Sequence, residues 1–250
     1  MSSLSKTFYA VVAGVGSGTG RSVALRFAKA YPVVLLARHN DSYDGIVSEI
    51  QQQGGQAVGI SADTSDPQSL STAFETIKKE HPDKKLAAAI FNVSGGLTFK
   101  SFLELNVDDI DASHKANSRS FFNFAQNVIP QLLDSVDAAP PNPPTLLVTG
   151  ATASVRGSAR FGPFAAGKFA VRALSQSLAR EFGPQGVHVA HAIIDGVIDI
   201  PRTQGYNVNE GKPDGKIAPD AIAESYWYLH TQHRSGFTQE LDIRPYVEKF

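Results

Sequence analysis

Cysteine is absent from this 250-residue sequence, so disulfides and thiolate metal sites are excluded. A chain without cysteine fits a reducing compartment, and redox chemistry in it needs a cofactor. An excess of charge is absent as well, since 23 lysines and arginines face 24 acidic residues and leave a net charge of −1. This balance gives no electrostatic reason to expect nucleic acid or an anionic membrane as a partner.

Long apolar runs are also missing. No stretch approaches the length of a transmembrane helix, and residues 1–6 lack the apolar core of a signal peptide. Residues 248–250 do not form a peroxisomal signal. We therefore expect a cytoplasmic protein whose partner is a small-molecule substrate.

Glycine, by contrast, is concentrated near the N-terminus. The apolar run 8–13 predicts a buried strand, a glycine cluster follows at 14–20, and the amphipathic segment 21–30 predicts a helix. Glycine accepts positive φ and has no Cβ, so backbone N–H groups can close on a phosphate at the helix N-terminus. The pattern predicts a dinucleotide site, with an ordinary flexible turn as the alternative. The residues expected to contact the cofactor in this turn are Gly14, Gly16, Ser17, Gly18, Thr19 and Gly20.

Gly14, Gly18 and Gly20 have the spacing G-x-x-x-G-x-G, which resembles the cofactor fingerprint of the short-chain dehydrogenase/reductase family. The stretch 91–95, Phe-Asn-Val-Ser-Gly, is a partial match to the family's Asn-Asn-Ala-Gly and keeps Asn92 and Gly95. The resemblance covers nearly the whole chain. It implies that Asn92 and Gly95 also belong to the cofactor site.

Apolar runs that predict strands alternate with amphipathic segments that predict helices. The expected strands are 8–13, 31–37, 56–61, 85–91, 145–149, 186–194 and 237–243. The expected helices are 21–30, 43–53, 67–81, 108–133, 164–182 and 219–231. This order predicts an α/β fold: a doubly wound (Rossmann) parallel sheet of about seven strands with helices on both faces, in a single domain over 1–250. The proline-rich run 138–144 is expected to be a surface loop, and the resemblance implies a substrate lid at 196–215.

Arg38 follows the second expected strand, 20 residues after Gly18. A carboxylate at this place would bond the ribose 2′-hydroxyl, whereas an arginine accommodates a 2′-phosphate. We therefore expect NADP(H) as the cofactor, with a solvated arginine at a strand end as the alternative. Asp63 follows the third strand, where the resemblance implies a bond to the adenine; the alternative is a helix cap before Pro67.

The resemblance places the family's catalytic tyrosine and lysine, spaced Y-x-x-x-K, at 164–168. Lys168 is present, but Phe164 stands at the tyrosine position. The family serine, 13 residues before the tyrosine, falls on Ala151, and a slip of one residue would bring Thr152 in as a hydroxyl. Asn117 matches the family's helix asparagine, which orders a proton-relay water; its alternative is an exposed helix residue.

The stretch after the sixth strand departs from the family as well. Asp195 replaces a proline, and Ile200 replaces a threonine that helps hold the nicotinamide carboxamide. Gly196 and Ile198 remain expected cofactor contacts. The run 162–168 also spells G-x-x-x-x-G-K, but no Ser or Thr follows and no strand precedes it, so a P-loop is not expected. The histidines lack metal-ligand spacing, and no metal is predicted.

Carbonyl reduction needs a proton for the developing alkoxide, and phenylalanine cannot donate one. Two hypotheses therefore remain. The first is an NADP(H)-dependent oxidoreductase with an atypical active site, transferring hydride to an imine or iminium ion or to a conjugated C=C. The second is a non-redox cofactor-binding protein acting as a regulator or as a scaffold for a rearrangement. The helices around Asn117 and Ala170 match those that pair in many family members, so we expect a homodimer or homotetramer.

Overall fold

The computed structural model describes residues 4–249, and its centre is a sheet of seven parallel strands in the order β3-β2-β1-β4-β5-β6-β7. The strands are β1 (Phe8–Ala13), β2 (Val33–Ala37), β3 (Ala57–Ser61), β4 (Lys85–Phe91), β5 (Thr145–Thr149), β6 (His188–Ile194) and β7 (Glu240–Ile243). The helices are α1 (Thr19–Ala28), α2 (Asp44–Gln52), α3 (Pro67–Glu80), α4 (Val107–His114), α5 (Ser120–Val136), α6 (Gly162–Phe182) and α7 (Pro219–His230).

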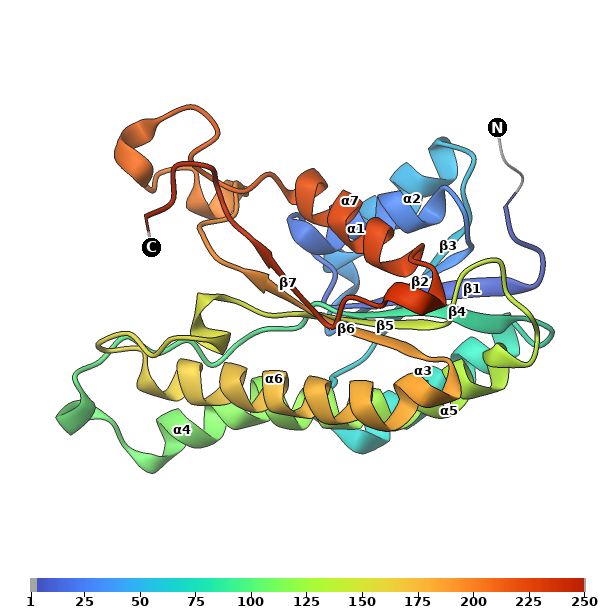
Figure 1. Ribbon diagram of the computed structural model, residues 1–250, viewed down its shortest axis with the longest axis horizontal. Coiled ribbons are helices and arrows are strands. Elements are labelled where there is room, and N and C mark those ends of the chain that lie inside the picture. Colours follow the sequence, from blue (N-terminus) through green and yellow to red (C-terminus); the bar gives the residue numbers. More distant parts are fainter. Residues whose placement is uncertain (1–3, 250) are drawn as a thin grey trace.

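Helices cover both faces of the sheet. Figure 1 shows α1, α2 and α7 above it and α3, α4, α5 and α6 below it. Each face of the sheet has its own hydrophobic core, and alternate residues of β1 enter the two cores. Ala10 and Val12 belong to the core with α1, α2 and α7, and Val11 and Ala13 belong to the core with α3, α5 and α6. Burial on both faces explains why β1 is apolar throughout rather than alternating. The predicted doubly wound α/β fold is confirmed.

The strand order reverses between β1 and β4. The chain runs outward from β1 to β2 and β3, and then returns to place β4 on the other side of β1. The loops that follow β1 and β4 therefore leave the sheet in opposite directions, and a crevice opens between them. Gly14 and Asn92, the first residues after these strands, are in contact at the base of this crevice.

The predicted helix 108–133 is continuous in the structure but not α-helical throughout. A π-helical turn, Lys115–Arg119, joins α4 to α5. Side chains donate hydrogen bonds to backbone carbonyl oxygens around this turn. Asn117 donates to Ser113 O at 2.9 Å, and Ser120 donates to Lys115 O at 2.9 Å. Such turns carry no apolar periodicity that a sequence would reveal.

Other differences concern boundaries and loops. The first helix begins at Thr19 rather than 21, and the last strand begins at Glu240 rather than 237. The run 138–144 contains no helix or strand, as predicted for a loop. Segment 196–215 holds two short 3₁₀ turns, Pro201–Thr203 and Asn209–Gly211, and projects at the upper left of Figure 1. None of the described helices combines the length and apolar character needed to cross a bilayer.

Buried histidines make the stability of this fold depend on pH. His230 hydrogen-bonds with the Tyr31 hydroxyl at 2.9 Å and with Thr145 Oγ1 at 3.0 Å, and burial lowers its pKa to about 3. Burial likewise lowers the pKa of His191 to about 4. In the unfolded chain a histidine titrates near pH 6.5, so below that pH the unfolded state takes up protons that the folded state does not.

We therefore expect the free energy of unfolding to fall by about 1.4 kcal/mol per pH unit for each of these histidines between pH 6.5 and 4.5. His230→Gln should flatten the slope by that amount, whatever it does to stability at pH 7. Urea unfolding across this pH range measures it, with the exposed His233→Gln as the control. If His230→Gln left the pH dependence of the unfolding free energy unchanged, His230 would not be a source of the acid destabilisation.

Candidate functional site

The glycine turn after β1 is shaped by the loop after β4. Gly14 has φ +86°, and a Cβ on it would lie 2.6 Å from the Asn92 carbonyl oxygen. A Cβ on Gly20 would lie 2.6 Å from the Gly14 oxygen. Gly16 has nothing within 4 Å of its Cβ position and faces open space. The turn thus has glycine where backbone segments touch and an open concave side where a phosphate could approach.

Two adjoining cavities run along the carboxyl ends of the strands. The first has a volume of about 540 Å³, and the second, at the glycine turn, about 530 Å³. Both are lined by Gly14, Asn92 and Ser94, so they meet at the reversal point of the sheet. Predicted residues lining the first are Gly14, Arg38, Asp63, Asn92 and Gly95. Predicted residues lining the second are Gly14, Gly16, Ser17, Gly18, Thr19, Gly20, Asn92, Ala151, Phe164, Lys168, Gly196 and Ile198.

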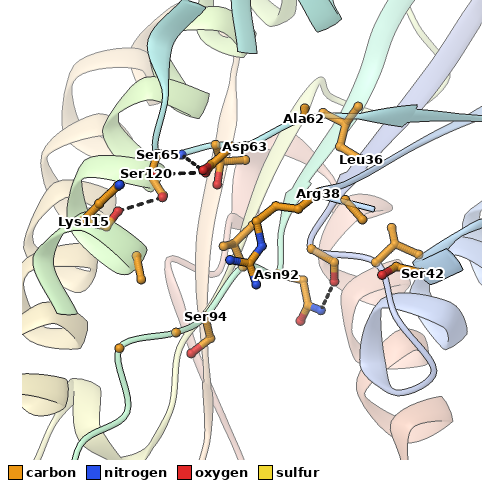
Figure 2. Close-up of a pocket in the computed structure, with 18 of the residues that line it drawn as sticks. Leu36, Arg38, Ser42, Ala62, Asp63, Ser65, Asn92, Ser94, Lys115 and Ser120 are labelled. Atoms are coloured by element: carbon orange, nitrogen blue, oxygen red, sulfur yellow. Dashed lines mark hydrogen bonds between the residues drawn. The ribbon is translucent and has the colours of Figure 1, made fainter. Parts of the chain in front are cut away.

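The first cavity is bordered by charged side chains from three elements. Figure 2 shows Arg38 pointing into it from the end of β2, with Asp63 on one side and Lys115 beyond. Asp63 Oδ1 accepts hydrogen bonds from the Ser65 N–H at 2.9 Å and the Ser65 hydroxyl at 2.7 Å. Burial raises the pKa of Asp63, but these bonds and the charges of Lys115 and Arg38 outweigh it, so the pKa is lowered. The cap of α3 is Asp66, which accepts from the Gln68 N–H at 3.0 Å, and not Asp63.

A chain of hydrogen bonds ties the ends of β1, β4 and β5 together. Asn92 Nδ2 donates to Gly14 O at 2.9 Å, and Thr149 Oγ1 donates to Asn92 Oδ1 at 3.0 Å. The Thr149 hydroxyl also bonds with the Tyr226 hydroxyl at 2.7 Å. The sequence predicted Asn92 but not Thr149 or Tyr226. Tyr226 lies on the apolar face of α7, and it reaches the end of β5 only through tertiary packing.

Lys168 stands at the inner wall of the second cavity. Its side chain is only 2% exposed, and Nζ donates to Thr149 O at 3.2 Å. The ammonium lies 5.9 Å from the centre of the Phe164 ring. Burial lowers the pKa of Lys168 to about 8, which brings its titration close to neutral pH.

Asn117 lies on the π-helical turn and is fully buried. Its Nδ2 donates to Gly95 O and to Ser113 O, each at 2.9 Å, which joins the helix to the loop after β4. Its Oδ1 has no hydrogen-bond partner among the described residues. The alternative of an exposed helix asparagine is therefore wrong.

Ala151 and Phe164 line the second cavity beside Lys168, and neither carries a polar side-chain atom. Thr152 is placed differently. Its hydroxyl donates to Asp195 Oδ1 at 2.5 Å, and Asp195 is in turn paired with Arg244 at 3.0 Å. Thr152 is not among the described residues that line the cavity, so its hydroxyl serves this ion-pair network.

The comparison with family models decides the class. Residues 9–210 match the model of the short chain dehydrogenases. This chain belongs to that family. Among curated relatives, an uncharacterized oxidoreductase of Staphylococcus aureus (strain USA300) is 26% identical over 237 residues, covering 94% of this chain and 96% of that protein. The 1-cyclohexenylcarbonyl-CoA reductase of Streptomyces collinus is 24% identical over 214 residues, covering 85% and 72%.

Two solved structures illustrate the likeness in fold. That of the short-chain dehydrogenase from Rhodopseudomonas palustris is 30% identical, covers 95% of this chain and 99% of its own, and has a TM-score of 0.75. An alcohol dehydrogenase from the archaeon Thermococcus sibiricus, solved with 5-hydroxy-NADP, is 22% identical with a TM-score of 0.81 and covers 98% and 99%. The chain is thus an oxidoreductase of short-chain dehydrogenase type, and structural neighbours of it bind NAD(P) cofactors.

Burying the Lys168 charge destabilises the fold. Since burial lowers its pKa from 10.5 to about 8, the penalty is full below pH 8 and disappears as the pH rises to that of the unfolded lysine. Lys168→Met should therefore raise the free energy of unfolding at pH 7 by about 2 kcal/mol, and the gain should shrink above pH 8. Urea unfolding measures it, with the exposed Lys78→Met as the control. A loss of stability at pH 7 would show that the bond to Thr149 outweighs the burial penalty.

Proposed function

We propose that this short-chain dehydrogenase is an NADP(H)-dependent reductase of conjugated C=C bonds. The observation that carries the proposal is the second cavity, where Lys168 is retained but its neighbours Phe164 and Ala151 offer no hydroxyl. A ketone needs an acid at this place, and losing a positioned acid costs typically ~10² to 10⁴ in rate. Hydride adds to the β-carbon of a conjugated C=C and gives an enolate, whose α-carbon takes a proton from water in a later step. The carbonyl oxygen therefore needs no acid while hydride is transferred.

The residues present fit NADP(H). The glycine turn would hold the diphosphate, since added Cβ atoms at Gly14 and Gly20 would collide with backbone. Arg38 points into the first cavity, where a 2′-phosphate would lie. Lys168 would hold the nicotinamide ribose, and Asp63 the adenine. When bound, NADPH supplies the hydride.

The charge of the second cavity favours a C=C substrate over an iminium ion. Among its described lining residues the charged side chains are Lys168 and Arg202, and there is no carboxylate. The ammonium of Lys168 repels a cationic iminium substrate, but it stabilises negative charge that develops on a conjugated carbonyl oxygen. Phe164 gives the cavity an apolar side against which a planar unsaturated group can pack. The name of the Streptomyces collinus relative, a reductase of 1-cyclohexenylcarbonyl-CoA, agrees with this substrate class.

A second candidate function is cofactor binding without hydride transfer. It is favoured by Ile200, whose Cγ2 lies 2.8 Å from the position of a Gly18 Cβ and so rests on the glycine turn. An apolar contact there removes the hydroxyl that the family uses near the nicotinamide. In this case the chain would act as a regulator or as a scaffold for a rearrangement.

We further propose that the protein is a homodimer or homotetramer assembled through α5 and α6. Each of these helices exposes a large aromatic side chain, Phe122 at 51% and Phe169 at 41%. Light scattering at micromolar concentration should show an oligomer, and Phe122→Glu should shift it toward monomer by burying a charge in the interface. The exposed Tyr228→Glu on α7 is the control. A wild type that is only monomeric would remove this proposal.

The cofactor preference is tested at Arg38. NADPH should bind more tightly than NADH, and Arg38→Asp should reverse the preference, because a carboxylate repels the 2′-phosphate and can bond a free 2′-hydroxyl. Calorimetric titration of both cofactors measures it. Equal affinities of the wild type for NADPH and NADH would contradict the preference.

The catalytic assignment is tested by restoring the missing groups. Phe164→Tyr combined with Ala151→Ser should place an acid near Lys168 and a hydrogen-bond donor on the carbonyl, and should create reduction of small activated ketones. Neither single variant should suffice, because such groups act as a unit. A gain of about 10²-fold corresponds to roughly 2.7 kcal/mol of transition-state stabilisation. A folded double variant that binds NADPH but reduces no ketone would favour the non-redox function.

A further inference from the structure

The second cavity contains one cationic side chain to which the proposed function gives no binding role, that of Arg202. Arg202 is exposed and lies on the 3₁₀ turn Pro201–Thr203. Within residues 4–249 it makes no hydrogen bond or ion pair with another side chain. Its guanidinium is therefore free to bind an anion that enters the cavity.

The turn that carries Arg202 is fixed against the glycine turn. Thr203 is buried, and its hydroxyl accepts from the Ile200 N–H at 3.1 Å. Lys216 Nζ donates to Thr203 O at 2.7 Å and secures the turn from the other side. Ile200 rests on Gly18, at the start of α1. The backbone position of Arg202 is thus set by contacts on both sides, so the turn itself need not become ordered when an anion binds.

Charge leaves Arg202 as the principal anion-binding group of this cavity. Its described lining has no acidic residue, and the other cation, Lys168, is buried and bonded to Thr149 O. The glycine turn offers only neutral N–H groups, and Ile200 offers no polar atom. We therefore expect an anion bound at the glycine turn to form its ion pair with Arg202.

We propose that Arg202 binds the diphosphate of the nicotinamide cofactor, an assignment that rests on the proposed function. The diphosphate is common to NADPH and NADH, whereas the 2′-phosphate that Arg38 faces belongs to NADPH alone. The two arginines thus read different phosphates of one ligand from two adjoining cavities. A guanidinium can donate two hydrogen bonds to a pair of phosphate oxygens, and it also carries a positive charge. The neutral N–H groups of the glycine turn supply hydrogen bonds but no charge.

The test compares Arg202→Gln with Arg38→Gln in calorimetric titrations of NADPH, NADH and 2′-AMP. Arg202→Gln should weaken NADPH and NADH by the same factor, about tenfold at low ionic strength, and leave 2′-AMP unchanged. Arg38→Gln should weaken NADPH and 2′-AMP and leave NADH unchanged. Arg234→Gln, at an exposed arginine of the turn before β7, is the control and should change none of the three.

Two further measurements keep the assignment falsifiable if Arg202→Gln folds poorly. Arg202→Lys keeps the charge and should cost only a few-fold in affinity for either dinucleotide. Added salt should weaken NADH binding to the wild type and to Arg202→Lys by similar factors, and should weaken NADH binding to the uncharged Arg202→Gln less. Unchanged affinity of the folded Arg202 variants for both dinucleotides, or a loss confined to NADPH, would overturn the assignment alone. A wild type that binds neither dinucleotide would overturn the proposed function together with it.

Discussion

The contact between the turn after β1 and the turn after β4 is the constraint on which the rest of the site depends. Gly14 touches the Asn92 backbone so closely that a Cβ would lie 2.6 Å from its carbonyl oxygen, and Asn92 Nδ2 returns a hydrogen bond to Gly14 O. Thr149 extends this link to β5. Because these strands flank the reversal of strand order, their joined ends set the floor of both cavities.

A buried lysine adds an energetic cost to this arrangement. Lys168 has its pKa lowered to about 8 by burial, and its ammonium bonds to a single carbonyl, that of Thr149. A fold selected for stability alone would place an apolar side chain there. Phe164 and Ala151, which line the cavity beside Lys168, carry no polar side-chain atom. The presence of a costly buried lysine there therefore indicates that the cavity has a function despite the missing hydroxyls.

Strand ends and residue spacing were enough to predict part of the site from the sequence. Arg38 and Asp63 come immediately after apolar runs, so their place at the crevice is set by the parallel sheet alone. Tyr226 and Arg202 could not be found in this way, because helix α7 and the turn after β6 bring them to the site only in the folded chain. The π-helical turn at Asn117 was also missed, since side-chain bonds to carbonyls create it without changing the apolar pattern.

The central proposal is that the second cavity transfers hydride without a tyrosine acid. A single-turnover measurement tests it most directly: NADPH-loaded protein is mixed with an excess of substrate, and the absorbance band of the reduced nicotinamide is followed. Conjugated enones or enoyl thioesters should bleach the band, while saturated ketones of matched size should leave it unchanged. Bound NADPH whose absorbance no substrate changes, or a band that saturated ketones alone bleach, would contradict the claim.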